Sequence, residues 1–402
     1  FTIKISRKTY NKLFDDIINL FEEDLREQGK GSFLDLKEED YSTLMVVPYW
    51  AWYDKKSEVL SILSQYKDDS CIKYSWDLIK DSLEKYICFI TGNRIEISPY
   101  SIDTKKFGLF TNSSHRILMS ATTQDDAFFI KGLDFSVDAV KNPLINNNQI
   151  WSGEKMLILP QLVDDSLDQK LVVTRLMRAK HDGFGIVSIV PNTKKADYYS
   201  KQGGIITNSN NIFKEIDKLK KGEFNKILVV NNRYDGIDLP DETCRILIID
   251  SKPYFENLCD RYEELCRPDS DIINKKIAQQ IEQGLGRGVR GEKDFCVILI
   301  IGNDIVKFMR SIETRKYFSE QTRKQIDIGL DISELAKDDV KNGEEPFKSL
   351  VGLINQWLGR VDDWKMFYTS KMNGLSKNEQ SLIDYTVLEK ERNIEKYFLQ
   401  EE

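Results

Sequence analysis

Five short apolar runs between residues 152 and 303 constrain the fold of this chain more than any other feature. They are KMLILP at 155–160, FGIVSIVP at 184–191, KILVVN at 226–231, CRILIID at 244–250 and FCVILIIG at 295–302. Helical patterns at 166–180, 192–201, 209–221 and 272–285 lie between several of them. Continuous β-branched runs that alternate with helices indicate a parallel sheet covered on both faces. We therefore predict an open α/β domain over residues 151–305.

The sequence on both sides of this domain is mostly helical in pattern. Apolar residues recur at close to a 3.6-residue period over 9–27, and helical patterns follow at 44–66 and 75–87, so residues 1–85 are predicted to form a helical accessory region. The Ile-rich stretch 86–99 predicts a pair of strands, and Ile117 to Met119 a further short strand. Residues 306–402 are predicted to be helical, with packing anchors at Trp357, Trp364, Phe367 and Tyr368.

Composition excludes several classes of protein. The chain has only two histidines, and its six cysteines form no Cys-x-x-Cys pair, so the usual zinc and iron-sulfur spacings are absent. Scattered cysteines favour a reducing, cytoplasmic compartment, and no apolar run is long enough to predict a membrane span. The net charge of -7 argues against a generally basic nucleic-acid coat but not against a local basic groove.

The string IEQGLGRGVRGEKD at 281–294 is the most specific candidate site. It places Gln283, Gly286, Arg287 and Arg290 in the spacing Gln-x-x-Gly-Arg-x-x-Arg, at the end of a helical stretch and before a strong strand. Two arginines three residues apart share one helical face, where their guanidinium groups can meet successive phosphate oxygens. Arginines near a helix end can also cap carbonyls or bridge to surface carboxylates.

Three further candidates follow predicted strands, where functional groups of open α/β sheets gather. In NNRYDGIDLP, Gly236 permits a backbone turn and Asp238 offers a carboxylate, although Asp238 could also be a plain turn residue. Asn192 and Thr193 follow the second apolar run and could equally cap the next helix. The third is the triplet Ser120, Ala121 and Thr122 after Ile117 to Met119, which could be an ordinary strand end.

Taken in order, the Ser-Ala-Thr triplet, the Pro-Asn strand end, NRYDGIDLP and QGLGRGVR resemble motifs III to VI of superfamily 2 helicases of the DEAD/DEAH-like class. The resemblance covers about residues 85–305. It implies an ATP-dependent motor of two RecA-like lobes, in which 86–150 ends the first lobe and 151–305 forms the second. The sequences of the last two motifs look most like those of bacterial anti-phage defence helicases of the Hachiman type. This resemblance implies DNA rather than RNA as the nucleic acid, and a partner protein from a defence system.

The resemblance also implies a role for each candidate residue. Arg287 and Arg290 would be the arginine fingers, and Gln283 would orient the nucleotide or the attacking water. The remaining roles are nucleotide binding and lobe closure for Gly236, Asp238 and Gly286, coupling of hydrolysis to movement for Ser120, Ala121 and Thr122, and nucleic-acid backbone contacts for Asn192, Thr193, Asn231 and Asn232. Asn231 and Asn232 stand where many members have Thr, which weakens the phosphate contact implied there.

No Gly-x-x-x-x-Gly-Lys-Ser/Thr occurs in the sequence, and no strand ends in an Asp-Glu pair suited to Mg²⁺. We therefore expect the P-loop lobe, with the ATP cradle and the Mg²⁺ ligands, to precede Phe1, and the 402 residues alone to be inactive. The competing hypothesis is a helicase-like lobe that has lost catalysis and serves as a docking module. Trp50 and Trp52 are expected in a core, with base stacking as the alternative.

Overall fold

The computed structural model describes residues 2–119, 126–144, 151, 153–178, 183–234, 236–289, 291, 294–375 and 385–400. The chain forms two compact units, each described below by itself. Unit 1 comprises residues 1–143, 255–269 and 382–402, and unit 2 comprises 144–254 and 270–381. Among the described helices, none combines the length and apolar composition that crossing a membrane requires.

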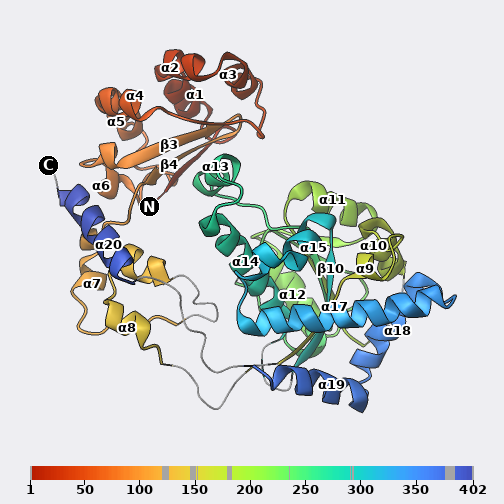
Figure 1. The fold of residues 1–402 in the computed structure, drawn as a ribbon. Helices are drawn as coiled ribbons and strands as arrows, with labels where there is room; N and C mark the ends of the chain where they lie inside the picture. Colours follow the sequence, from red (N-terminus) through yellow and green to blue (C-terminus); the bar gives the residue numbers. More distant parts are fainter. Residues whose placement is uncertain are drawn as a thin grey trace. The chain divides into compact units, whose positions relative to one another are not determined.

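Unit 1 contains a four-stranded antiparallel sheet in the order β1-β4-β3-β2 (Figure 1). Its strands are β1 Ile3–Ser6, β2 Leu44–Val46, β3 Tyr86–Thr91 and β4 Arg94–Pro99. The predicted strand pair at 86–99 is the hairpin β3–β4, closed by Gly92 and Asn93. Residues 1–85 are therefore not purely helical as predicted, since β1 and β2 complete this sheet. These two strands have only four and three residues, too few to give a strong alternating pattern.

Helices cover one face of this sheet. They are α1 Asn11–Leu20, α2 Glu22–Gln28, α3 Lys30–Lys37, α4 Tyr49–Asp54, α5 Lys56–Ser64 and α6 Trp76–Ile79. Alternate strand residues, such as Ile5, Cys88 and Ile97, point into the core that these helices share. Trp52 belongs to this core and donates from Nε1 to the carbonyl of Leu83 at 2.9 Å, whereas Trp50 is exposed. The expectation of a buried pair therefore holds for Trp52 alone.

The opposite face of the same sheet is covered by α13 Leu258–Cys266, which comes from much later in the chain. Phe89 packs against Tyr262 with 5.5 Å between ring centroids. The backbone amide of Leu258 donates to the fully buried carboxylate of Glu96 at 2.7 Å, which satisfies a donor at the start of the helix. Arg94 Nε lies 3.3 Å from the same carboxylate.

The rest of unit 1 consists of short helices and the C-terminal helix. They are the 3-10 helix η2 Thr104–Lys106, α7 Gly108–Thr111, the π-helix η3 Phe128–Gly132, α8 Val137–Lys141 and α20 Tyr385–Gln400. Lys131 pairs with Glu391 of α20 at 3.0 Å. Ile117 to Met119, predicted as a strand, form no strand, and Ile117 and Met119 are exposed. An apolar run of three residues pairs as a strand only where a neighbouring strand is available.

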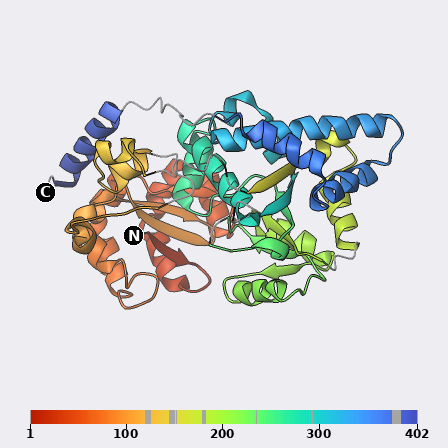
Figure 2. The same ribbon diagram turned by 90° about the horizontal axis from the view of Figure 1, so that it is seen from below.

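Unit 2 is built on a six-stranded, wholly parallel sheet in the order β5-β10-β9-β6-β8-β7. Figure 2 shows the ribbon turned by 90° about the horizontal axis. Its strands are β5 Glu154–Ile158, β6 Ile186–Val190, β7 Ile205–Thr207, β8 Leu228–Asn231, β9 Ile246–Asp250 and β10 Phe295–Ile301. All five predicted runs form strands, and the predicted α/β class is confirmed. The edge strand β7 was not predicted, because its three residues give too short a pattern.

Crossover helices connect these strands, and the chain then continues into a group of longer helices (Figure 1). The helices are α9 Pro160–Val163, α10 Gln169–Arg178, α11 Thr193–Lys201, α12 Ile212–Lys220, α14 Asp271–Leu285, α15 Asn303–Arg310, α16 Ile312–Arg315, α17 Glu320–Lys341, α18 Pro346–Leu358 and α19 Asp362–Met372, with 3-10 turns η4 Asp241–Thr243 and η5 Gly286–Gly288. Helix α17 crosses β5 so closely that a Cβ on Gly329 would lie 2.7 Å from the carbonyl oxygen of Leu157. Trp357 and Tyr368 are buried in the core that these helices complete.

The predicted boundaries at 85, 150 and 305 differ from this division. Residues 86–99 join the N-terminal sheet, and α17 to α19 share the core of the parallel sheet. Each sheet face needs an apolar cover, and the covering segments come from outside the predicted domains.

Candidate functional site

The loops after β6 and β8 meet at one edge of the parallel sheet, because parallel strands present their carboxyl ends together. Asn192 caps α11, accepting from the backbone amide of Lys195 at 3.0 Å. Asn231 Nδ2 lies 3.3 Å from Thr193 Oγ1, and the amide of Asn232 donates to the carbonyl of Val190 at 2.7 Å. The structure thus brings together the four residues predicted to contact a nucleic-acid backbone.

These four side chains have the chemistry of a phosphate-backbone contact. Asn192 and Thr193 are exposed at the start of α11, where backbone amides favour anions. The Oδ1 atoms of Asn231 and Asn232 are buried and accept no hydrogen bond in the described part of the chain. Amide and hydroxyl groups bind phosphate and sugar oxygens without reading sequence.

A charged pair beside this edge was missed by the sequence analysis. Asp250 ends β9 and is fully buried, and Lys195 Nζ lies 3.5 Å from its Oδ1. Burial raises the pKa of Asp250, while the Lys195 ammonium and hydrogen bonds from Ser251 and Tyr199 oppose that rise. The sequence signal was present, as an Asp after a buried run and a Lys in a first helical turn, but pairing them required the strand order.

The loop after β8 alternates buried and exposed residues. Ile237 and Leu239 are buried, while Gly236 and Asp238 are exposed. Gly236 has a φ of 70°, in the left-handed region that glycine adopts without strain, and no atom lies within 4 Å of where its Cβ would be. The two candidates of this loop therefore face outward on a backbone that its apolar residues anchor.

Arg287 lies in η5, directly after α14, and reaches this loop. Its Nε donates to the carbonyl of Tyr234 at 2.8 Å, and its Nη1 donates to the carbonyl of Ile237 at 3.0 Å. Two bonds from one guanidinium fix its plane and its place beside the loop that carries Gly236 and Asp238. The structure therefore joins the two most specific strings of the sequence.

The glycines at 284, 286 and 288, around Arg287, differ in how much space surrounds them. A Cβ on Gly284 would lie 2.8 Å from Cδ1 of Tyr234, and one on Gly288 would lie 2.7 Å from Sγ of Cys296. Gly286 has open space around it, and Gln283 is partly buried one turn before Arg287. Gly284 and Gly288 thus let the arginine-bearing helix end pack closely on the sheet and on the Tyr234 loop.

Four predicted site residues lie outside the described residues: Ser120, Ala121, Thr122 and Arg290. Within the described ranges, no group of three or more His, Cys, Asp or Glu is placed to hold a metal ion.

The comparison with protein families decides what this sheet and these loops belong to. Residues 193–325, which span α11 to the first turns of α17, match the model described as "Helicase C-terminal domain". This part of unit 2 is therefore similar to helicase C-terminal domains. The expected RecA-like second lobe is therefore confirmed as a fold, with six parallel strands. The matched residues include Arg287, Gly236, Asp238 and the Asn231–Thr193 contact.

Several solved structures resemble the chain. One titled "XPD_APO" is 15% identical, with 79% of this chain and 71% of that chain covered and a TM-score of 0.47. Xpd4 from S. tokodaii is 15% identical over 80% and 71%, with a TM-score of 0.41. The C-terminal domain of the DEAD-box protein Dbp5 is 16% identical over 43% and 88%, with a TM-score of 0.26.

These TM-scores are low, so the assignment of the helicase C-terminal domain rests on the family match and the sheet. The chain spans 63–71% of the XPD chains that it matches. No curated protein matches the sequence. The matches give no support to the narrower resemblance to Hachiman-type defence helicases.

Proposed function

We propose that this chain is the C-terminal part of an ATP-dependent nucleic-acid helicase or translocase, acting on DNA in preference to RNA. The observation that carries the proposal is the placement of Arg287. Within a helicase C-terminal domain, its guanidinium is fixed by two carbonyls of the loop that bears Gly236 and Asp238. A cation held in this way can stabilise charge that develops on a phosphate without having to reorganise.

ATP and Mg²⁺ are implied by the family, and the residues of this chain fit only part of their site. Arg287 suits contact with a phosphate oxygen, because its guanidinium carries a permanent positive charge and is held beside the Gly236 loop by its bonds to Tyr234 and Ile237. The described residues supply no metal-binding cluster, and the sequence has no P-loop string. In this proposal the phosphate cradle and the metal ligands come from a partner lobe.

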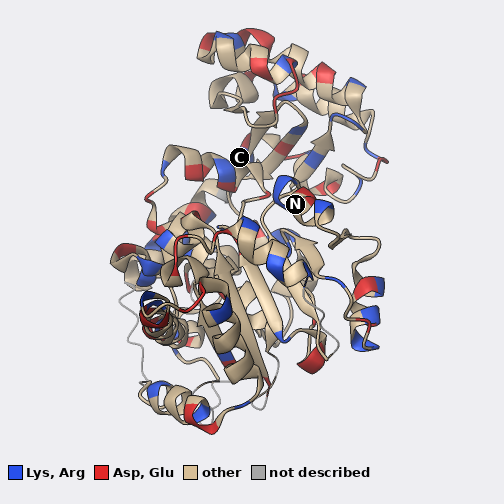
Figure 3. Cartoon of the chain, turned by 90° about the vertical axis from the view of Figure 1, so that its right-hand side faces the viewer, with Lys and Arg blue, Asp and Glu red and all other residues tan. Residues whose placement is uncertain are grey.

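The nucleic acid would bind at the edge formed by Asn192, Thr193, Asn231 and Asn232. Their groups bind a sugar-phosphate backbone, which agrees with sequence-independent movement. A local site also agrees with the charge of the molecule, since Figure 3 shows both signs spread over its helices while the central strands carry almost none.

The test is nucleic-acid-stimulated ATP hydrolysis by the longest product of the reading frame. We expect Arg287→Ala to lower the turnover number about a thousandfold or more, as loss of an arginine finger does. Arg287→Lys keeps the charge but not the paired bonds and should recover little activity. Arg178→Ala, at an exposed position at the end of α10, is the control and should be unchanged.

Two results would count against the proposal in different ways. Full turnover by a folded Arg287→Ala protein would remove the catalytic role of this residue. Absence of turnover from the longest product would favour the docking-module hypothesis instead. Thermal unfolding of each variant separates loss of chemistry from loss of fold.

A further inference from the structure

Lys195 is held against a fully buried carboxylate at the carboxyl edge of the parallel sheet. Its Nζ lies 3.5 Å from Oδ1 of Asp250 and donates to Oε1 of Gln169 at 2.8 Å. The Lys195 side chain remains 33% exposed, while that of Asp250 is 0% exposed. The ammonium is therefore anchored from inside the protein and still reachable from outside.

Asp250 can be buried because each of its oxygens is satisfied. Tyr199 donates to Oδ2 at 3.0 Å, and Ser251 donates to Oδ1 at 2.8 Å. Gln169 donates from Nε2 to Oδ2 and accepts from Lys195 through its Oε1, so its amide links the carboxylate to the ammonium. Burying a carboxylate without such partners would destabilise the folded state by roughly several kcal/mol. These hydrogen-bonding and charged partners of Asp250 therefore allow its carboxylate to stay ionised inside the protein.

The position of Lys195 is unusual for a lysine. It lies in the first turn of α11, where the helix dipole disfavours a cation. The buried Asp250 carboxylate offsets this unfavourable interaction between the Lys195 ammonium and the helix dipole. An anion bound on the solvent side of Lys195 would offset it further. Asn192, Thr193 and Asn231 lie at the same edge of the sheet.

We infer that Lys195 binds a phosphate of the nucleic-acid backbone, and that Asp250 and Gln169 are positioning residues that hold its ammonium for that contact. The inference rests on the proposed function, since it uses the same edge. A free lysine side chain loses rotamer freedom when it binds, and a lysine that is already held loses less.

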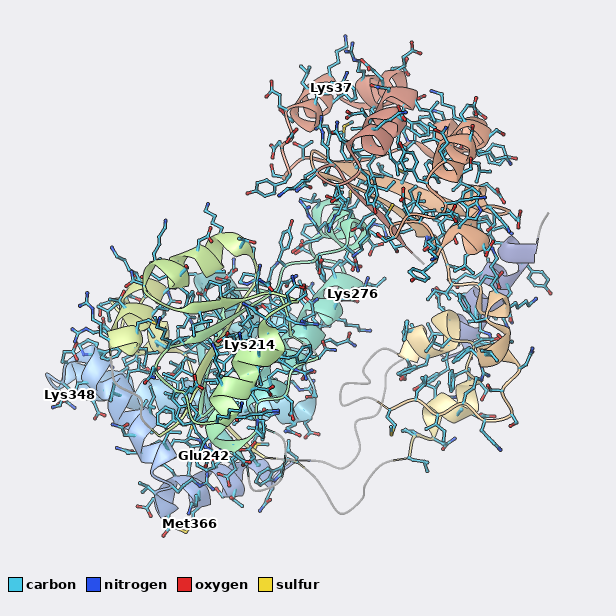
Figure 4. All side chains as sticks on the ribbon, turned by 180° about the vertical axis from the view of Figure 1, so that it is seen from behind. Lys37, Lys214, Glu242, Lys276, Lys348 and Met366 are labelled. Carbon is cyan, nitrogen blue, oxygen red and sulfur yellow. The ribbon has the colours of Figure 1, made fainter. Side chains whose placement is uncertain are left out.

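The first experiment measures how many phosphates the protein neutralises. Binding of a fluorescein-labelled oligothymidylate to the 402-residue chain is followed by fluorescence anisotropy over a series of salt concentrations. We expect Lys195→Ala to weaken binding about tenfold at low salt, as loss of a charged hydrogen bond does. The slope of log affinity against log salt should fall in magnitude by about 0.7, the value for one contact to a single strand. Lys214→Ala, at an exposed position on α12 (Figure 4), should change neither.

The second experiment separates positioning from binding. Asp250→Asn removes the negative charge that lies 3.5 Å from the Lys195 ammonium and replaces one acceptor oxygen by an NH₂ donor, so Lys195 loses its buried counter-charge. We expect about a threefold loss of affinity with an unchanged salt slope, because the cation is still present but less well placed. In a Lys195→Ala background the same change should have no further effect on binding.

A rescue variant sharpens this test. Asp250→Asn combined with Gln169→Glu transfers the carboxylate from position 250 to position 169. The carboxylate at 169 can then accept from the amide NH₂ at 250 and from Lys195. Affinity should return to within twofold of the parent, as for restored partners of one network. If Asp250→Asn does not fold, Gln169→Ala, at a partly exposed position, removes the amide that bridges Asp250 and Lys195 and carries the same expectation.

The outcomes distinguish this inference from the proposed function. An unchanged salt slope in folded Lys195→Ala, with tight binding by the parent, would overturn the inference and leave the proposed function standing. An equal effect of Asp250→Asn with and without Lys195 would reduce Asp250 to a structural role. Failure of the parent chain to bind the oligothymidylate would overturn the nucleic-acid edge and this inference together.

Discussion

The two sheets of this protein are covered in different ways. The parallel sheet of unit 2 is covered by its own crossover helices and by α17 to α19, all from residues 144–254 and 270–381. The antiparallel sheet of unit 1 has helices from residues 11–79 on one face only. Its other face takes α13, from residues 258–266.

This difference shows in the strand sequences. In unit 2, β9 and β10 are almost continuously apolar, because both faces are buried. In unit 1, Glu96 stands between Ile95 and Ile97 on β4, and Phe89 lies opposite Glu96 on β3. Glu96, the polar residue in the alternating pattern of β4, therefore does not face solvent. It binds the start of α13, a helix from much later in the chain.

The largest expected effect tests the independence of the two cores. Ile298 is fully buried on β10, and Ile298→Ala should lower the free energy of unfolding of unit 2 by about 2–5 kcal/mol through the lost contacts and the cavity. Denaturant unfolding should show two transitions, with only one moved. Ile5→Ala, in the core of unit 1, should move the other. A single transition shifted equally by both variants would contradict this view of separate cores.

A smaller effect tests the anchoring of α13. Glu96→Ala removes the acceptor for the amide of Leu258 and a partner of Arg94, and should destabilise unit 1 by about 1–3 kcal/mol. Hydrogen exchange of residues 255–269 should accelerate more than exchange elsewhere in unit 1. Glu96→Gln keeps an acceptor and should have a milder effect, while Glu58→Ala, at an exposed position on α5, serves as the control. Unchanged exchange in 255–269 would show that Glu96 does not hold the helix.

The smallest expected effect concerns pH. Burial raises the pKa of Asp250 in the folded protein above its unfolded value, so the folded state binds this proton more tightly. The stability that Asp250 contributes should therefore fall as pH rises through the interval between the two pKa values. Relative to Asp250→Asn, the parent should gain stability when pH is lowered from neutral into that interval. Thermal unfolding of both proteins over a pH series measures this, and a pH-independent difference would contradict it.

Long periodic patterns could be predicted well from the sequence, and short ones could not. Five of the six strands of the parallel sheet and the helices α10, α11, α12 and α14 were predicted, because each run is long enough to show its period. β1, β2 and β7 have three or four residues and depend on neighbouring strands for their hydrogen bonds. The run from Ile117 to Met119 shows the converse, an apolar segment that forms no strand.

The candidate site divides in a similar way. The arginine string and the NRYDGIDLP loop were identified by spacing, and the structure joins them through Arg287. The link between Lys195 and Asp250 has no spacing to identify it, since 55 positions separate the two residues and their contact depends on β6 and β9 being neighbours in the sheet.

The sequence by itself determined the parallel α/β lobe and the residue types at its carboxyl edge, because hydrophobic period and strand-end loops are local properties. Only the tertiary structure decided which loops meet, which charges are buried together and which distant helix covers the second face of the N-terminal sheet. Those outcomes depend on strand order and packing, which join residues far apart in the chain and leave no periodic trace in it.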